Sequence, residues 1–315
     1  MKKSVLFAGT ALVVAAALAG PALAQNYPEK PVSFVVPFPP GDLEDVLTRI
    51  IAEDFQADYG QPSAVINRPG GGGGPFPGAV TVAQAPADGY TIGSFVIDVP
   101  VTGPHIDIPE LAPNPFEPVG IFLTYPFVLA SLKTAPFQNV DELADYAKGE
   151  KVVLGHFGAE LPPTQVSFAL AKVKGFEWGS EAAFDSLDCN VLASGDVDVM
   201  NTTMQQILPC LDQVNVLATV TDERIALVPD APTLAEIDPQ LKLALWNGLF
   251  VKKGTPPEVI EKIAASAKKA VMGERAQQVA KDTGALVYWM DAADAAKKIA
   301  EDEATVGNIN TLLGQ

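Results

Sequence analysis

The stretch VGIFLTYPFVLASL, residues 119–132, is a long apolar run with Pro126 in its middle. A strand inside one sheet rarely contains an internal proline, because proline has no N–H group to donate to the neighbouring strand. The run therefore predicts a strand that leaves one sheet, passes a hinge and joins a second sheet. A second apolar run, LALWNGLFV at residues 243–251, predicts a return crossing. Together the two runs divide the chain into two lobes.

Strand-like and helix-like segments alternate on both sides of these crossings. Apolar runs at 32–36, 64–66 and 91–96 predict strands, and the periodic apolar residues over 43–59 predict a helix between the first two. This βαβαβ order predicts an α/β fold with mostly parallel sheets flanked by helices. Gly-Thr-Pro-Pro-Glu at 254–258 predicts the start of another long helix, because proline is favoured in the first helical turn.

We expect two domains after the N-terminal segment. A discontinuous first lobe comprises residues 25–124 and 246–315, and a continuous second lobe comprises residues 125–245. Small molecules bind preferentially in clefts between such lobes. The layout therefore predicts a binding protein that holds its ligand in the inter-lobe cleft.

The N-terminal segment, residues 1–24, has the pattern of a secretory signal peptide. Lys2 and Lys3 precede an apolar stretch, and the tripeptide ALA fits a cleavage site after its last residue, Ala24. We therefore expect a periplasmic protein without a membrane anchor. Of the 21 Lys and Arg residues, 19 remain after cleavage against 38 Asp and Glu, which disfavours nucleic acids and anionic membranes as partners.

The two cysteines, Cys189 and Cys210, leave two interpretations open. An even pair in an oxidising compartment can form a disulfide bond, which would close a loop of about 20 residues. Alternatively, both are small buried side chains. His105 and His156 do not have metal-ligand spacing with these cysteines, so we expect no metal site, and no cofactor is predicted.

Several further stretches occur in an order that is similar to one known family. They are YPEKPVSFVVPFPPG (27–41), INRPGGGGG (66–74), ADGYTIG (87–93), GDVDVM (195–200), PDAPTLAEI (229–237), W-x-G-L-F (246–250) and GTPPEVIEKI (254–263). They resemble the Bug-type solute receptors of tripartite tricarboxylate transporters, from about Tyr27 to the C-terminus.

The resemblance implies a type II-like periplasmic-binding-protein fold with two crossover strands at the hinge. It also implies a small carboxylate or dicarboxylate as the ligand, which is handed to a tripartite tricarboxylate-type membrane permease. The family performs no chemistry, so the resemblance implies a receptor and not an enzyme. We expect a monomer.

The stretch PFPPGDLEDVLTR, residues 37–49, is the first candidate for ligand binding. A strand, a turn and a helix N-terminus meet there, and free backbone N–H groups at such a place attract anions. Asp42 stands where the family usually has a second glycine. Asp42 either caps the helix through its side chain, with Asp45 at the third helical position, or it faces the ligand.

The predicted ligand-binding residues come from this loop, from the ends of other strands and from the second-lobe turn. They are Phe38, Pro40, Gly41, Asp42, Asp45, Gly72, Ser94, Phe95, Asp98, His156, Phe157, Gly158, Thr164, Gln165, Phe184, Asp185, Asn201 and Thr202.

Acidic residues are unusually frequent at these positions. The acids Asp42, Asp98, Glu160 and Asp185 stand where the family arranges neutral donors, and neighbouring carboxylates repel an incoming anion. Arg49 and Arg68 match positions common in the family, and we interpret both as structural. An amine-bearing, zwitterionic or cationic solute is therefore the alternative ligand, and the aromatic residues that could contact a cation are Phe38, Phe95, Phe157, Phe184 and Trp246.

Two other functional classes remain as alternatives. One is a cleft hydrolase, although the Gly-x-Ser-x-Gly motif of serine hydrolases is absent from the sequence. The other is a ligand-sensing subunit that presents its bound form to a membrane kinase. The run Gly70–Gly74 is followed by no Lys-Ser/Thr pair, so the sequence disfavours a nucleotide site.

Overall fold

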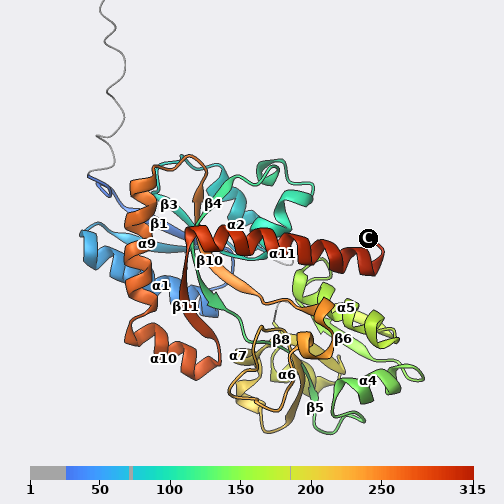
Figure 1. Ribbon diagram of the computed structural model, residues 1–315. Coiled ribbons are helices and arrows are strands. Elements are labelled where there is room, and N and C mark those ends of the chain that lie inside the picture. The colour runs from blue at the N-terminus through green and yellow to red at the C-terminus, as the bar shows by residue number, and fades with distance from the viewer. Residues whose placement is uncertain (1–25, 71–73, 185) are drawn as a thin grey trace, which may run out of the picture.

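The computed structural model describes residues 26–70, 74–184 and 186–315 of the chain. The predicted signal peptide and the predicted site residues Gly72 and Asp185 lie outside these ranges. Within them the chain forms two α/β lobes, each built around its own sheet (Figure 1). The predicted two-lobed fold is confirmed.

The first lobe contains a six-stranded sheet in the order β11-β4-β10-β3-β1-β2. Its strands are β1 (Val32–Val36), β2 (Ser63–Asn67), β3 (Thr91–Val96), β4 (Phe116–Thr124), β10 (Trp246–Lys252) and β11 (Leu286–Asp291). Its helices are α1 (Leu43–Tyr59), α2 (Phe76–Ala83), α3 (Asp98–Val101), α9 (Pro257–Val271), α10 (Glu274–Thr283) and α11 (Ala292–Leu313).

The second lobe contains a five-stranded sheet in the order β7-β6-β8-β5-β9. Its strands are β5 (Phe127–Leu132), β6 (Val153–His156), β7 (Ser180–Ala183), β8 (Val199–Thr203) and β9 (Val214–Thr219). Its helices are α4 (Val140–Ala147), α5 (Pro162–Lys174), α6 (Cys189–Ser194), α7 (Met204–Ile207) and α8 (Leu234–Ile237).

The first crossing runs as the interrupted apolar stretch predicts. Strand β4 belongs to the first sheet, Tyr125 and Pro126 follow it, and β5 belongs to the second sheet. The return segment re-enters the first sheet as β10, and the Tyr125 N–H donates to the Leu245 carbonyl at 2.8 Å, which ties the two crossings together. We propose lobe boundaries at 124/125 and 245/246, where the chain changes sheets.

Both sheets are mixed, which corrects the expectation of mostly parallel ones. Strand β1 pairs in parallel with β2 and β3, and β6 pairs in parallel with β7 and β8. The crossing segments account for the difference, because β10 returns against β4 and lies between β4 and β3, antiparallel to both. Likewise β5 runs antiparallel to β8 and β9.

Helix α1 is positioned by the amphipathic pattern that the sequence predicts. Its buried stripe includes Leu43, Leu47, Ile51 and Phe55, and the Phe55 ring contacts Phe34 of β1 edge-on, with 5.9 Å between centroids. This packing holds α1 against β1, and the short connection between residues 36 and 43 places the start of α1 near the carboxyl end of β1. The preceding residue Gly41 has φ of 96°, a conformation that favours glycine, so the turn into the helix depends on it.

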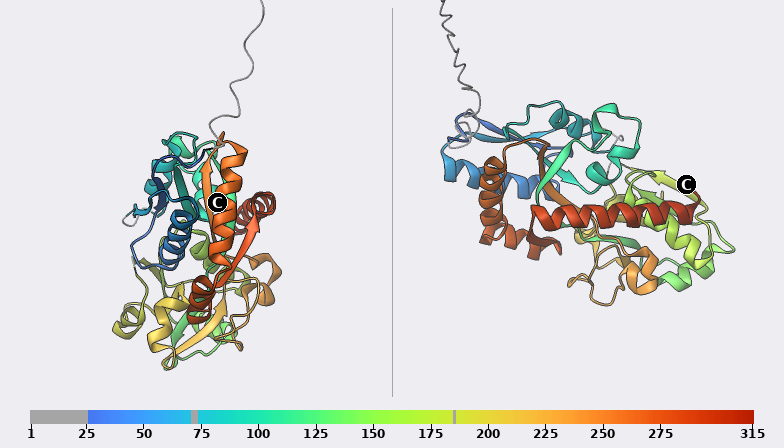
Figure 2. Two further views of the ribbon diagram at one scale, coloured as in Figure 1. Left: turned by 90° about the vertical axis from the view of Figure 1, so that its left-hand side faces the viewer. Right: turned by 45° about the horizontal axis from the view of Figure 1, so that its top comes forward.

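The C-terminal helix α11 spans both lobes. It begins beside β11 in the first lobe, packs on β4 and α3, and extends to α5 of the second lobe (Figure 1, Figure 2). The indole Nε1 of Trp246 on β10 donates to the Asp302 carboxylate of α11 at 2.7 Å, and Lys298 pairs with the same carboxylate at 2.8 Å. The hydrogen bond from Trp246 therefore joins α11 to β10 next to the hinge.

Cys189 and Cys210 form a disulfide bond, which resolves the alternatives that the sequence leaves open. The bond joins α6 to the segment after α7, beside the buried side chains of Leu192, Met204 and Ile207 in the second-lobe core.

We expect that replacing both cysteines by alanine lowers the free energy of unfolding by about 3 kcal/mol, because the bond restricts a loop with a sequence separation of 21 residues in the unfolded chain. Urea unfolding of the two proteins measures the difference. Reductant should shift the wild-type midpoint toward that of the variant and leave the variant unchanged. Equal midpoints in non-reducing buffer would contradict the expectation.

Candidate functional site

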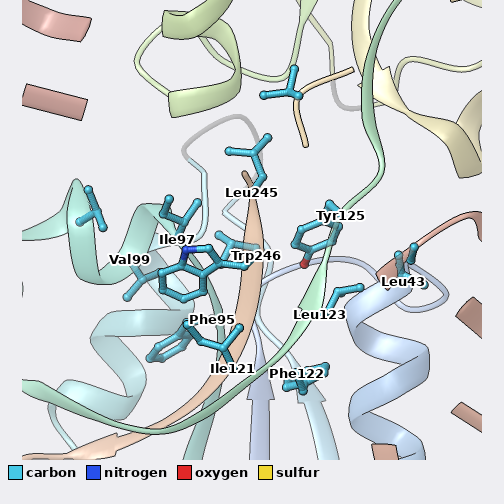
Figure 3. Packing of buried hydrophobic residues seen from close by; sticks show 14 of the residues in the cluster. Leu43, Phe95, Ile97, Val99, Ile121, Phe122, Leu123, Tyr125, Leu245 and Trp246 are labelled. Carbon is cyan, nitrogen blue, oxygen red and sulfur yellow. The ribbon is translucent and has the colours of Figure 1, made fainter. Parts of the chain in front are cut away.

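A cavity of about 340 Å³ lies between the lobes at the hinge. The first lobe contributes the loop after β1, the start of α1 and the start of α3, and the second lobe contributes residues after β6 and β8 and the start of α5. Tyr125, Leu245 and Trp246 line the cavity where the two crossing segments meet, above the first-lobe core (Figure 3).

Asp42 stands at the N-cap position of α1, but its side chain makes no capping hydrogen bond. Asp45, at the third helical position, bonds instead to the turn before the helix, because its Oδ2 accepts from the Gly41 N–H at 2.8 Å. Asp42 instead lines the cavity. Burial, and then the charge of Asp45, raise the pKa of the Asp42 carboxyl above its ordinary value.

Asp45 is held by the protein itself. Its carboxylate accepts from both the Nε and an Nη atom of Arg49 at 2.9 Å and from the side-chain amide of Asn67 at 2.8 Å. Desolvation alone would raise the pKa of Asp45, but the hydrogen bonds from Arg49, Asn67 and Gly41 outweigh it and hold the pKa below its ordinary value. Asp45 and Arg49 therefore brace the loop, and neither lines the cavity.

Glu44 is a cavity residue that the sequence analysis missed. It is 3% exposed, and its Oε2 accepts from the Tyr125 hydroxyl at 3.0 Å. Burial, followed by the charge of Asp42, raises the pKa of the Glu44 carboxyl to about 8. A carboxyl group with this pKa retains its proton over much of the neutral range.

Asp98, at the start of α3, is the third acid of the cavity. It is 6% exposed, and its Oδ1 atom is buried without a hydrogen-bond partner among the described residues. Burial raises the pKa of this carboxyl to about 7. A buried carboxyl oxygen without a donor is costly, so this atom is suited to an N–H or O–H group of a ligand.

A chain of buried hydrogen bonds supports the Glu44 side of the cavity. The Tyr125 hydroxyl also contacts Asn247 Oδ1 at 3.3 Å, and the Asn247 amide donates to Ser94 Oγ at 2.8 Å. Ser94 in turn shares a hydrogen bond of 2.8 Å with Thr48 of α1. The chain joins α1, β3, β10 and the hinge, and it fixes Tyr125 in position.

The second-lobe wall is aromatic and uncharged. Phe127 lies edge-on between Tyr125 and Phe157, with ring centroids 6.1 and 6.0 Å apart. The other second-lobe residues of the lining are Leu161, Pro163, Phe184, Thr203, Gln205 and Gln206. Among the lining residues of the described ranges there is no Lys, Arg or His, and the undescribed internal positions are three glycines and Asp185.

Of the predicted ligand-binding residues, five line the cavity: Phe38, Asp42, Asp98, Phe157 and Phe184. The others within the described residues do not: Pro40, Gly41, Asp45, Ser94, Phe95, His156, Gly158, Thr164, Gln165, Asn201 and Thr202. Glu160, which the sequence analysis counts among the cleft acids, is exposed and does not line it either.

The residues away from the cavity have other partners. Phe95 packs in the first-lobe core against Phe116 and Phe250. His156 is buried beside Glu181, and its Nδ1 accepts from the Gly158 N–H at 3.0 Å.

Polar side chains of the second lobe bond within that lobe. Asn201 donates to Ser167 Oγ at 2.6 Å, and Thr202 donates to the Leu187 carbonyl at 2.8 Å. Their hydrogen bonds place these side chains inside the second lobe.

One sequence signal could have identified the hinge residues of the lining. Both crossings must pass beside an inter-lobe cleft, so the residues next to Pro126 and at the start of WNGLF were candidates by position alone. Tyr125 and Leu245 lie there. Glu44 carried no such signal, because an acid in a first helical turn is ordinary at an exposed helix end.

Within the described ranges, the helices are all too short or too polar to cross a membrane.

Comparison with known proteins agrees with this architecture. A family model described as the tripartite tricarboxylate transporter family receptor (TctC) matches residues 47–314. A UPF0065 protein from Pseudomonas sp. strain P51, from the tcbD–tcbE intergenic region, is 29% identical over 299 residues, which cover 89% of this chain and 85% of that protein.

Two solved structures share the fold. The periplasmic binding protein BugD is 26% identical, with a TM-score of 0.77 over 91% of this chain and 99% of that one. MatC from Rhodopseudomonas palustris, solved with bound malate, is 24% identical, with a TM-score of 0.74 over 91% of this chain and 99% of that one. This chain belongs to the TctC family of tripartite tricarboxylate transporter receptors.

Proposed function

We propose that this chain is a periplasmic receptor that binds a small organic cation between its lobes and delivers it to a tripartite tricarboxylate-type permease. One observation carries the choice of a cation: Asp42, Glu44 and Asp98 line the same cavity, and no Lys or Arg of the described residues lines it with them. The proposal includes secretion through the N-terminal signal, with cleavage after Ala24.

A carboxylate ligand, which is the default that the family resemblance implies, suits this cavity less well. MatC is described with bound malate, but here an anion at the start of α1 would meet Asp42, and the charge of the Asp42 carboxylate would oppose its own. Like charges within about 4–6 Å disfavour each other's ionised forms, and the cavity provides no basic side chain to offset them. The balance favours a positively charged solute.

An organic cation also fits the apolar part of the lining. Phe38, Phe127, Phe157 and Phe184 supply aromatic surface to the cavity. Aromatic faces attract ammonium groups by about 0.5–2 kcal/mol and bury apolar carbon favourably. We therefore infer an amine with a carbon body, bound unchanged and released to the permease.

Replacing Asp42 by Asn is expected to lower the affinity for small amines by at least about tenfold, because a hydrogen bond to a charged group contributes about 1.5–3 kcal/mol. Stability should not fall, since the Asp42 side chain caps nothing. Isothermal titration of the mature protein with phenethylamine measures the change. A thermal-shift panel of amines that also contains malate and adipate compares the two classes of solute.

Asp107→Asn is the matched control, because it removes one carboxylate from an exposed position that does not line the cavity. Its amine affinity should equal that of the wild type. Binding of malate or adipate in preference to every amine, with an increase in Asp42→Asn, would overturn the proposal.

A further inference from the structure

We propose, on the basis of the cation-binding function above, that the ligand carries its only charge toward the first lobe and an uncharged apolar end toward the second. The receptor would then select monocationic amines with an apolar body and reject zwitterions such as α-amino acids. The argument rests on the start of α5, the second-lobe wall and the position of the acids.

The start of α5 lies at the cavity, where Leu161 and Pro163 line it. A helix start ordinarily attracts anions because its first N–H groups are free. Here the first two helical residues are Pro162 and Pro163, which have no N–H groups. The next two N–H groups, of Thr164 and Gln165, donate to the Leu161 carbonyl at 2.9 and 3.0 Å.

The Leu161 N–H is also engaged, since it donates to the Gly158 carbonyl at 3.2 Å. The residues from Leu161 to Gln165 therefore present no free backbone donor to the cavity. This differs from an ordinary helix start, and the Pro-Pro pair in the sequence is the cause. A carboxylate placed against the start of α5 would lose its water without gaining a backbone donor there.

The side chains of the second-lobe wall offer no positive charge in place of those donors. Phe127, Phe157 and Phe184 are apolar, and Gln205 and Gln206 are neutral. The lysines of α5, Lys172 and Lys174, are at the opposite end of the helix from the cavity.

The acidic side chains that line the cavity, among the described residues, lie on the first lobe. Asp98 has a buried Oδ1 atom without a donor, and the Asp42 side chain makes no capping bond. The start of α1 does offer backbone N–H groups, but Asp42 and Glu44 line the cavity at that same place. The carboxylate of an α-amino acid would be held beside its own ammonium group and thus beside these acids.

Among the described residues, the cavity is therefore acidic on the first-lobe side and uncharged and mainly apolar on the second-lobe side. The edge-on series Tyr125, Phe127 and Phe157 continues from the hinge into the second lobe and places aromatic carbon beside the cavity along this side. A ligand with one ammonium group and an aromatic or alkyl body satisfies both sides.

Three probes that differ by one group each test this inference by isothermal titration: phenethylamine, phenylalanine and 3-phenylpropionate. We expect phenethylamine to bind at least 100-fold more tightly than phenylalanine and 3-phenylpropionate to give no measurable binding. Equal or tighter binding of phenylalanine would overturn the inference and leave the proposed function standing. Binding of 3-phenylpropionate alone, or no binding of either amine, would overturn both.

A variant of the helix start provides a second test. The variant Pro162→Ala/Pro163→Ala restores two backbone N–H groups. It keeps the backbone carbonyl of residue 163, which accepts a hydrogen bond from the Asn201 side chain. We expect the variant to narrow the preference for phenethylamine over phenylalanine by about five- to tenfold, mainly through tighter binding of phenylalanine. Pro257→Ala, at the first position of α9 and outside the lining, is the control and should leave the ratio unchanged. An unchanged ratio in the double variant would contradict the role assigned to the prolines.

Discussion

The Glu44→Gln variant is expected to be more stable than the wild type at pH 8 and nearly equal to it at pH 4. Burial raises the pKa of Glu44 from 4.5 to about 8 in the folded protein. Between these values the folded state retains a proton that the unfolded state has lost, so the free energy of unfolding falls as the pH rises through this window. Below pH 4.5 both states are protonated and the contribution is constant.

The expected size follows from the pKa shift. One pKa unit corresponds to about 1.4 kcal/mol, so the full window corresponds to on the order of 4 kcal/mol at its upper end. Glutamine cannot ionise, and its amide oxygen can still accept from the Tyr125 hydroxyl that Glu44 binds at 3.0 Å. The variant removes the pH-dependent cost and keeps the contact.

Urea unfolding at pH 4, 6 and 8 measures the effect. The difference between variant and wild type should grow steadily with pH. Glu150→Gln, at an exposed residue three positions after the end of α4, is the control and should show no such trend. A constant difference at all three pH values would mean that Glu44 ionises normally in the folded protein.

The second large effect is expected at Trp246. Its side chain is 0% exposed, stacks on Phe250 at 6.2 Å between ring centroids, and forms part of the cavity lining. Replacement by alanine removes a large buried ring and should destabilise the protein by about 3–5 kcal/mol. It also removes the N–H group that donates to the buried Asp302 of α11.

Trp246→Phe separates packing from hydrogen bonding. It keeps most of the buried ring but leaves one oxygen of Asp302 without its donor, while Lys298 still pairs with the other. We expect a loss of about 1–3 kcal/mol.

Trp178→Ala, at a half-buried tryptophan of the second lobe, should cost less than Trp246→Ala. If Trp246→Ala lost less than 1 kcal/mol in urea unfolding, the core role of this residue would be refuted.

Much of the fold could be predicted because its decisive features are local. Pro126 interrupts an apolar run, and the two halves of that run do enter different sheets. The direction of strand pairing could not be predicted, because it depends on contacts between distant segments. The position of β10 between β3 and β4 is such a contact, and it makes the first sheet mixed.

For the site as well, the residues placed by local sequence could be predicted, and those placed by contacts between distant segments could not. Phe38, Asp42 and Asp98 come just after strands β1 and β3, and residues at the ends of neighbouring strands meet at one edge of a sheet. Ser94 lies within β3, and its hydroxyl forms hydrogen bonds with Thr48 and Asn247 and does not line the cavity. Glu44 reads as an ordinary first-turn acid, and only its contact with Tyr125, far along the chain, places it in the cavity.

The span of α11 across both lobes constrains how a solute enters. Because this helix packs on β4 in one lobe and on α5 in the other, parting the lobes on that side would break an existing interface. Rotation that preserves the interface opens a gap only on the remaining sides. A solute therefore reaches the cavity from a side of the molecule that lies away from α11.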